Sequence, residues 1–424
     1  MVTYNESHYP EPSLRRVEEG SDPHAELDRI MKTTPPSAII IGAGFTGCAL
    51  AYDLAQRGFA VMVVERGELA SGTSGRTHGL LHSGARYCVT DAEAAIECIQ
   101  ENIILRRIAK QCIEYNGGYF VALDDADLGY APAFFQGVQN CGIPVDEISV
   151  KRALEAEPAL NPKILTAFQV PDAAFDPLRL AMAFAASARQ HGAKFNTFFD
   201  VVGFLRDGQG KICGVSAINR HSGKPVDFHA DITVNATGAW AGKVAEFAGV
   251  TVPVRPTPGV MVAYEKRVTT RVINRLCEPD DGDILLPQRR MAVIGTTSFE
   301  VEEADYIPVY PDQVKQMHQR AALLVPELEN IKMRGAYMSA RPLIGGMMSG
   351  RSLSRTFKCY DHQTDEGING LVTVTGGKAT TCRAMAEKTA DLVCQKLGWQ
   401  RVCETAQYPL ADYHLYYQAN EAAA

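Results

Sequence analysis

A loop rich in glycine, histidine and arginine carries the residue types best suited to chemistry. The stretch "GRTHGLLHSGARY", residues 75–87, includes His78, His82, Arg86 and Tyr87. Arginine's planar guanidinium binds pairs of phosphate or carboxylate oxygens, and histidine exchanges protons near neutral pH. Glycine lets the backbone lie close to a flat ligand. The loop is therefore either an ordinary surface turn or a place where cations meet an anionic ligand.

Metal binding is one interpretation of the two histidines, which lie four residues apart. On a helix, that spacing places two ligands on one face. Gly79 and Gly84 disfavour a helix here, and the stretch contains no Asp or Glu. We therefore expect no metal at this loop.

A second glycine motif, GxGxxG at residues 42–47, lies between an apolar strand at 39–41 and a helix at 46–56. A second strand ends at Glu65, about twenty residues further on. The glycines allow a tight turn, close approach to a pyrophosphate and close packing of helix on strand. The helix N-terminus attracts phosphate, and Glu65 would accept hydrogen bonds from ribose hydroxyls. The motif predicts a dinucleotide site, with a glycine turn in an unrelated α/β protein as the alternative.

Two later turns favour FAD over NAD. The segment "NATGAWA", residues 235–241, ends an apolar strand with small residues, and "TGGKATT", residues 375–381, lies between a strand and a helix. The N-terminus of that helix could face the flavin ring, which develops negative charge when reduced. Three glycine turns spread this widely along the chain suit an extended FAD.

The remaining helices are predicted from capping and breaking residues. Thr90 and Glu93 have capping-box spacing before a long amphipathic segment. Further helices are expected from Pro177 to Gly192, at 311–324, and after the turn at 375–381.

Composition limits the class of protein. The chain has 424 residues, 46% hydrophobic and 21% charged, with a net charge of −7 and eleven scattered cysteines. This indicates a soluble protein of two or three domains without a nucleic-acid surface. The absence of CxxC pairs argues against a zinc ribbon or an iron–sulfur cluster, and free thiols suit the reducing cytoplasm. We see no signal peptide, and the longest apolar run, residues 37–52, is too short to span a membrane.

Six segments together resemble the FAD-dependent glycerol-3-phosphate dehydrogenases, and among them the catalytic subunit of the bacterial anaerobic enzyme. They are "IIIGAGFTGCALAYDLAQRG", "GRTHGLLHSGARYCVTDAEAA", "NATGAWA", "IGTTS", "SARPL" and "TGGKATTCRAMAE". They occur in the family's order over residues 37–405, and "HGLLHSGARY" followed by "TDAEA" is the most specific of them. The family belongs to the D-amino-acid-oxidase-like flavoproteins.

The resemblance implies an α/β fold with a Rossmann-like FAD-binding domain and a strand-rich α+β substrate domain, both built from discontinuous segments. We assign residues 37–90, 160–252 and 335–405 to the FAD-binding domain and residues 91–159 and 253–334 to the substrate or cap domain. Residues 1–36 are expected to form a flexible arm and residues 406–424 a C-terminal tail.

The resemblance also implies the site residues. Substrate would be bound by Arg86, Tyr87, Arg341, Arg355 and Lys378, and the catalytic group would comprise Arg86, Arg341 and His82. His82 would lie near the flavin, in positioning or proton transfer, or else as a structural histidine bonded to backbone. The cofactor-binding residues would be Gly42, Gly44, Phe45, Thr46, Gly47, Glu65, Arg66, Thr73, Ser74, Thr77, His78, Gly79, Leu80, Val202, Ala236, Thr237, Gly238, Trp240, Arg341, Gly377, Lys378, Ala379, Thr380 and Thr381.

The implied reaction is oxidation of glycerol 3-phosphate, or a related polyol phosphate, by hydride transfer from C2 to flavin N5. Electrons would pass to a quinone or a partner subunit, in the cytoplasm or peripherally on the cytoplasmic face of the inner membrane. The family's candidate base strand here carries Pro258 and Met261, and "IGGMMSG" at 344–350 replaces a more polar loop, so the base and the exact polyol stay open. An FAD-dependent 2-hydroxy-acid or amino-acid oxidase on the same fold, or a non-catalytic flavoprotein subunit, are the alternatives.

Overall fold

The glycine motif lies in a six-stranded sheet. The computed structural model describes residues 34–345 and 356–418. In order of pairing, the strands of this sheet are β19 (Phe357–Asp361), β20 (Leu371–Gly376), β13 (Ile232–Asn235), β1 (Ser37–Ile41), β2 (Ala60–Glu65) and β9 (Lys194–Thr197). All neighbours are parallel except the β19–β20 pair at one edge. Strands from both ends of the chain therefore bring their carboxyl ends to one edge.

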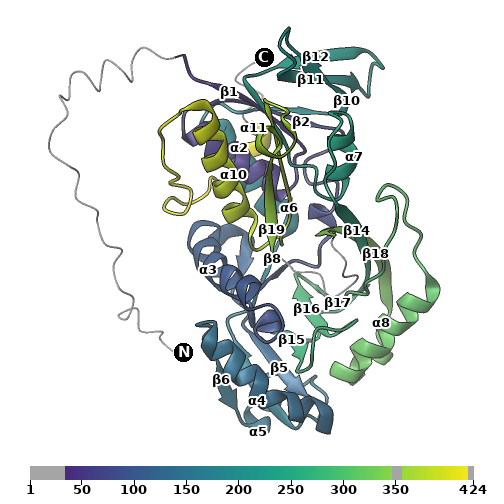
Figure 1. The fold of residues 1–424 in the computed structure, drawn as a ribbon. Coiled ribbons are helices and arrows are strands. Elements are labelled where there is room, and N and C mark those ends of the chain that lie inside the picture. The colour runs from purple at the N-terminus through teal and green to yellow at the C-terminus, as the bar shows by residue number, and fades with distance from the viewer. Residues whose placement is uncertain (1–33, 346–355, 419–424) are drawn as a thin grey trace, which may run out of the picture. The chain divides into compact units, whose positions relative to one another are not determined.

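Both faces of this sheet are covered, which explains why β1 is apolar throughout. Successive side chains alternate between faces, so Ala38 and Ile40 join the core shared with the helices α2 (Phe45–Gln56), α6 (Pro177–Gln190) and α10 (Cys382–Leu397). Ile39 and Ile41 face the other core, with Val215. That face is covered by the antiparallel strands β10 (Phe199–Arg206), β11 (Ile212–Asn219) and β12 (Pro225–His229), shown in Figure 1.

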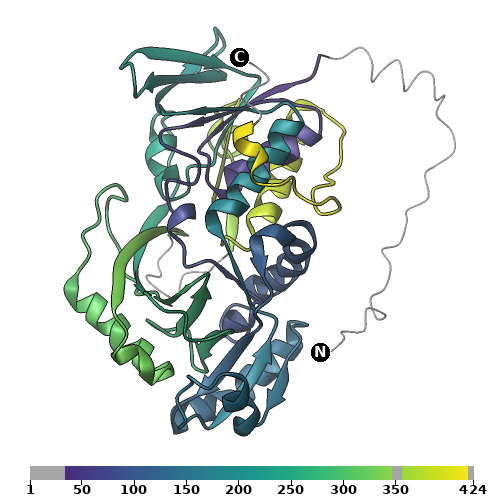
Figure 2. The same ribbon diagram turned by 180° about the vertical axis from the view of Figure 1, so that it is seen from behind.

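An eight-stranded sheet forms the second part of the fold. Its strands, in order of pairing, are β18 (Met333–Ile344), β14 (Val254–Tyr264), β17 (Met291–Gly295), β16 (Ile284–Gln288), β15 (Val272–Arg275), β5 (Gly118–Ala122), β7 (Thr166–Val170) and β6 (Asp146–Ile148). Helix α8 (Pro311–Leu324) packs on it through Met317 and Ala321 (Figure 2). The long β14–β18 pair sets Arg341 opposite Thr257.

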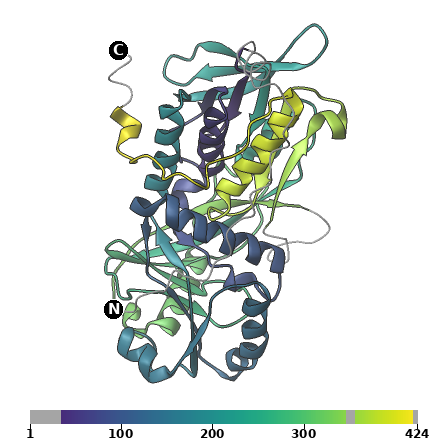
Figure 3. The same ribbon diagram turned by 90° about the vertical axis from the view of Figure 1, so that its left-hand side faces the viewer.

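Helix α3 (Ala92–Ile108) connects the two parts. It follows the short 3-10 turn η2 (Ala85–Tyr87), and Figure 3 shows it between the helices of the first sheet and the eight-stranded sheet. Its first half, with Ala95 and Ile99, packs beside the helix α4 (Asp125–Asn140), and its second half, with Leu105, packs beside α2 and α6. The remaining elements are β3 (Leu80–Leu81), β4 (Ile113–Glu114), β8 (Ala173–Phe175), α5 (Val150–Ala156), α7 (Ala241–Glu246), α9 (His362–Glu366) and α11 (Leu415–Gln418).

Most predicted elements are confirmed, including the βαβ unit at 37–65, the helix at 311–324 and the helix ended by Gly398 in the left-handed conformation. One cap is wrong. Asp91, not the Thr90–Glu93 box, caps α3, because its side chain accepts the amide hydrogen of Ala94.

The boundaries expected for the two domains do not coincide with the membership of the two large sheets. Strands β7 and β18 lie wholly or partly in segments assigned to FAD binding, yet both pair in the eight-stranded sheet. Within the expected C-terminal tail, Leu410 and Tyr416 are buried against the body. Residues 1–33 of the expected arm lie outside the described residues. No helix in the described ranges is long and apolar enough to cross a bilayer.

Candidate active site

One large cavity collects most of the predicted site residues. Its volume is about 870 Å³, and residues from both sheets and from the loop at 71–87 line it. The predicted residues that line it are Gly42, Gly44, Phe45, Thr46, Glu65, Arg66, Thr73, Ser74, Thr77, His78, Leu80, His82, Arg86, Tyr87, Val202, Ala236, Thr237, Gly238, Trp240, Arg341, Gly377, Lys378 and Ala379. Residues up to about 340 positions apart in sequence thus share one space.

Four predicted cofactor residues do not line the cavity, and the structure gives each a supporting contact. A Cβ on Gly47 would lie 1.9 Å from the carbonyl oxygen of Gly42, so this glycine lets α2 pack on the turn. Gly79 packs against Phe175 in the same way. The Thr380 hydroxyl accepts the His82 amide hydrogen at 3.1 Å, and the Thr381 hydroxyl accepts that of Lys378 at 3.1 Å. Arg355 lies outside the described residues.

The glycine turn is shaped for a dinucleotide. Gly42 has φ = 101°, in the left-handed region, and a Cβ there would meet the Ala236 carbonyl oxygen at 3.0 Å. Glu65, at the end of β2, accepts the backbone amides of Ala43 and Gly67, each at 2.8 Å. Its carboxylate is thereby held at the cavity wall, in the position that binds ribose hydroxyls in Rossmann-type folds.

A small ionic cluster lines part of this cavity. The Arg66 guanidinium stacks 4.3 Å from the Trp240 ring centre and pairs with Asp305 at 2.8 Å. Trp240 donates its indole hydrogen to the same carboxylate at 2.7 Å, and Lys243 lies 3.7 Å from it. Burial opposes ionisation of Asp305, but these partners lower its pKa below the ordinary value. No local pattern marks Asp305 beforehand, because it lies in the loop between β17 and α8, far in sequence from both Arg66 and Trp240.

Arg86 enters the cavity already paired. Its Nη1 forms an ion pair with Asp283 and its Nη2 donates to the Asp280 carbonyl at 3.1 Å. Arg86 and Asp283 are 9% and 2% exposed, so little water screens them. Burial alone would lower the pKa of Arg86, but Asp283 outweighs it and the pKa is raised. No pattern in the sequence marks Asp283 as this partner, because it lies 197 positions from Arg86.

Arg341 is held by uncharged acceptors. Its Nε donates to the Thr257 carbonyl at 3.1 Å and its Nη2 to the carbonyls of Pro258 and Thr297 at 3.2 and 2.9 Å. Its Nη1 donates to the Thr296 hydroxyl at 2.9 Å. These contacts orient the guanidinium, which lines the cavity.

Lys378 completes a group of three cations. Its ammonium lies 4.7 Å from the centre of the Tyr87 ring, in cation–π contact, and both residues line the cavity. Lys378 comes from the turn before α10, while Arg86 comes from η2 and Arg341 from β18. Of the four predicted cations, the three that the structure describes therefore line the same cavity.

The two histidines have different environments. His78 Nδ1 accepts the Leu80 amide hydrogen at 3.1 Å, so its proton is on Nε2. Burial, then the charges of Arg86 and Arg341, lower the pKa of His78 to about 4. The neutral ring can donate from Nε2 but cannot accept a proton there. The His82 ring lies beside Tyr87, with ring centres 5.4 Å apart, and it keeps the candidate role in proton transfer.

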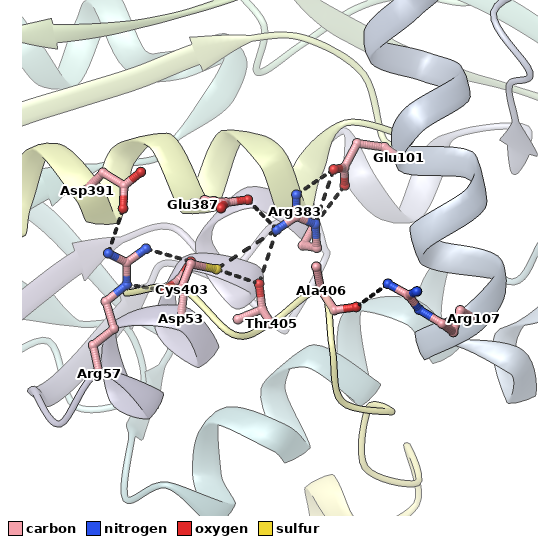
Figure 4. Close-up of polar contacts among 10 residues, drawn as sticks. All are labelled: Asp53, Arg57, Glu101, Arg107, Arg383, Glu387, Asp391, Cys403, Thr405 and Ala406. Atoms are coloured by element: carbon pink, nitrogen blue, oxygen red, sulfur yellow. Dashed lines mark hydrogen bonds and ion pairs between the residues drawn. The ribbon is translucent and has the colours of Figure 1, made fainter. Parts of the chain in front are cut away.

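A buried ionic network fixes the helices behind these loops (Figure 4). Arg383 of α10 pairs with Glu101 of α3 at 2.5 Å and with Glu387 at 2.6 Å. Because α3 follows Arg86 and α10 follows Lys378, this pairing fixes two of the cation-bearing loops relative to each other. Figure 4 also shows the C-terminal segment joining the network, with Thr405 accepting from Arg383 at 3.3 Å.

Comparison with known proteins identifies the class. Residues 37–392 match the model of the family described as "DAO: FAD dependent oxidoreductase". The chain belongs to this family, and its cofactor is FAD. The strand-end Glu65, the open glycine turn and the size of the cavity fit such a dinucleotide.

Individual relatives narrow the comparison. One relative is a protein of Escherichia coli strain K12 named as a subunit of the anaerobic glycerol-3-phosphate dehydrogenase. The two sequences are 41% identical over a region that covers 88% of the present chain and 69% of the E. coli protein. Among solved structures, the chain superposes on a glycerol-3-phosphate dehydrogenase from Bacillus halodurans complexed with FAD, with a TM-score of 0.68, 22% identity and coverage of 91% and 70% of the two chains. A glycine oxidase from Geobacillus kaustophilus gives a TM-score of 0.71, 21% identity and coverage of 89% and 99%. These two structures share the fold, which accommodates substrates of different classes.

The described residues offer no metal centre. Within residues 34–345 and 356–418, no group of three or more His, Cys, Asp or Glu side chains is arranged to hold a metal ion.

Proposed function

We propose that this protein oxidises glycerol 3-phosphate, or a closely related polyol phosphate, to the keto phosphate. The observation that carries the proposal is the convergence of Arg86, Arg341 and Lys378 on the cavity that also contains the glycine turn. A phosphate ester has nearly two negative charges and several acceptor oxygens, which suit two guanidinium forks and an ammonium. The similarity to the E. coli anaerobic glycerol-3-phosphate dehydrogenase protein supports the same substrate.

Each cation of the site has a separate role in binding the substrate. Arg341, oriented by hydrogen bonds to β14 and to the segment after β17, and Arg86 hold the substrate, and Lys378 adds a point charge beside Tyr87. FAD, when bound, supplies a two-electron acceptor for the carbon–hydrogen bond. Holding the reacting groups in place contributes about 7–11 kcal/mol to lowering such a barrier. Arg355, the other predicted phosphate ligand, belongs to the same proposal.

The substrate hydroxyl must lose a proton to a base. His78 is excluded as an acceptor at Nε2, because that nitrogen already carries the proton. His82 is the remaining candidate from the loop, since it lines the cavity beside Tyr87. We propose it as the proton acceptor.

Electron transfer onward requires a partner. Because the E. coli relative is named as one subunit of an enzyme, we propose that electrons leave to a second subunit or to a quinone. We further propose that the protein works in the cytoplasm, or peripherally on the cytoplasmic face of the inner membrane.

The test is an absorption spectrum of the purified flavoprotein, taken without oxygen before and after adding substrate. Glycerol 3-phosphate should bleach the flavin band, whereas glycerol, which lacks only the phosphate, should not. Bleaching by glycine or 2-hydroxyglutarate instead would favour an oxidase of amino or hydroxy acids. A flavin that no polyol phosphate reduces would refute the proposal and favour a non-catalytic flavoprotein.

A further inference from the structure

A turn of the eight-stranded sheet holds Arg86 at two points. The turn, residues 276–283, joins β15 to β16 and contacts Arg86 of η2. The Asp283 carboxylate pairs with Nη1 of Arg86 through Oδ2, and the same oxygen accepts the Asp280 amide hydrogen at 2.9 Å. The Asp280 carbonyl accepts Nη2 of Arg86. The guanidinium is therefore fixed in rotation as well as in place.

Asp283 acts from behind the cavity wall. Arg86, Pro279 and Ile284 line the cavity, whereas Asp283 is absent from its lining and 2% exposed. Its second oxygen, Oδ1, has no hydrogen-bond partner among the residues that the structure describes. The hydrogen bonds of the carboxylate are thus to Arg86 and to its own turn, and the carboxylate does not itself line the cavity.

The same turn also reaches Arg341. The Gly282 amide donates to the Thr296 carbonyl at 3.2 Å, and the Thr296 hydroxyl accepts Nη1 of Arg341 at 2.9 Å. Gly282 has φ = +64°, and a Cβ there would lie 2.8 Å from Met317 of α8. The turn is therefore closely packed. It contacts Arg86 directly and Arg341 through Thr296, so it links the positions of the two arginines.

We propose that Asp283 is a positioning residue of the anion site: it orients Arg86 toward the anionic group of the substrate and, through its turn, sets the spacing of Arg86 and Arg341. The identity of that group as a phosphate ester rests on the proposed function. The rival role is charge compensation alone. The two roles predict opposite signs, because losing a mere compensating charge would strengthen anion binding, whereas losing an orienting partner weakens it.

The experiment compares wild-type holoprotein with Asp283→Asn, in which the side chain keeps its size and loses its charge. Inorganic phosphate is titrated while the flavin absorption spectrum is followed, and KM and kcat are measured with glycerol 3-phosphate. We expect the Kd for phosphate and the KM to rise about tenfold or more, with kcat changing much less. Glu278→Gln is the matched control, because it removes one carboxylate from the exposed start of the same segment.

Binding of phosphate to Asp283→Asn as tight as, or tighter than, binding to wild type would overturn the proposal. So would a wild-type holoprotein in which neither phosphate nor glycerol 3-phosphate changes the spectrum. If wild type binds phosphate but does not oxidise glycerol 3-phosphate, the proposed function fails while the phosphate titration still decides the role of Asp283.

A second variant covers the case in which Asp283→Asn does not fold or does not retain FAD. Asp283→Glu keeps the charge and moves the carboxylate by one methylene. A positioning role predicts weaker phosphate binding in this variant too, at normal FAD content and melting temperature. Wild-type affinity in Asp283→Glu would show that charge suffices and would contradict positioning.

Discussion

Replacing Arg341 with alanine is expected to weaken the use of substrate far more than it weakens the binding of FAD. Its guanidinium is held by the carbonyls of Thr257, Pro258 and Thr297 and by the Thr296 hydroxyl, so the charge is in position before substrate arrives. Little conformational entropy is then lost on binding.

The size of the effect follows from the type of contact. A hydrogen bond to a charged group contributes about 1.5–3 kcal/mol, and about 1.4 kcal/mol is a factor of ten in an equilibrium constant. We therefore expect kcat/KM for glycerol 3-phosphate to fall roughly 10- to 150-fold in Arg341→Ala. The carbonyls left without their donor should also lower the melting temperature.

The assay measures kcat/KM with a dye as the electron acceptor. FAD content and melting temperature are recorded for each protein. Arg334→Ala is the control, because Arg334 lies in the same strand, β18, with an exposed side chain. It should change kcat/KM less than about twofold. If Arg341→Ala also stays within that range while retaining FAD, the assignment of Arg341 to the substrate is wrong.

Three other substitutions test the glycine turn, the ionic cluster around Asp305 and the histidine loop at residues 75–87. Gly47→Ala should give protein without bound FAD, seen as loss of the flavin absorption, because its Cβ would collide with the glycine turn. Asp305→Ala should weaken FAD binding measurably, but by no more than about tenfold, because its contacts with Arg66 and Trp240 are partly exposed. An unchanged rate of FAD release would contradict a role of Asp305 in orienting these two residues. The pKa of His78 is lowered from 6.5 to about 4, so only the unfolded state takes up its proton between those pH values. The free energy of unfolding should therefore fall as the pH falls from about 6.5 to 4. The full pKa shift corresponds to at most about 3 kcal/mol, and the actual loss should be smaller because the ring faces the cavity. The urea midpoints of unfolding of wild type and His78→Gln, each measured at pH 7.5 and pH 5, test this prediction. If the midpoint falls equally in both proteins between the two pH values, His78 does not cause the loss of stability.

The sequence alone determined the local devices of the fold. Residues 37–65 specify a strand, a glycine turn, a helix and a second strand, because the apolar runs, the glycines and Glu65 all lie within one short segment. The helices at 177–190 and 311–324 begin at prolines that suit a first helical turn. Such signals depend on neighbouring residues, and they can be recognised without knowing the rest of the chain.

Only the tertiary structure decided which distant side chains meet. Asp283 pairs with Arg86 across 197 positions, and no local pattern marks either residue as the other's partner. Asp305 reaches Arg66 and Trp240 in the same way. The assignment of β18 to the eight-stranded sheet depends on its long pairing with β14. Periodicity and capping report on a residue's neighbours in sequence, whereas ion pairs and sheet membership depend on how the whole chain closes on itself, and that information lies in no short stretch of it.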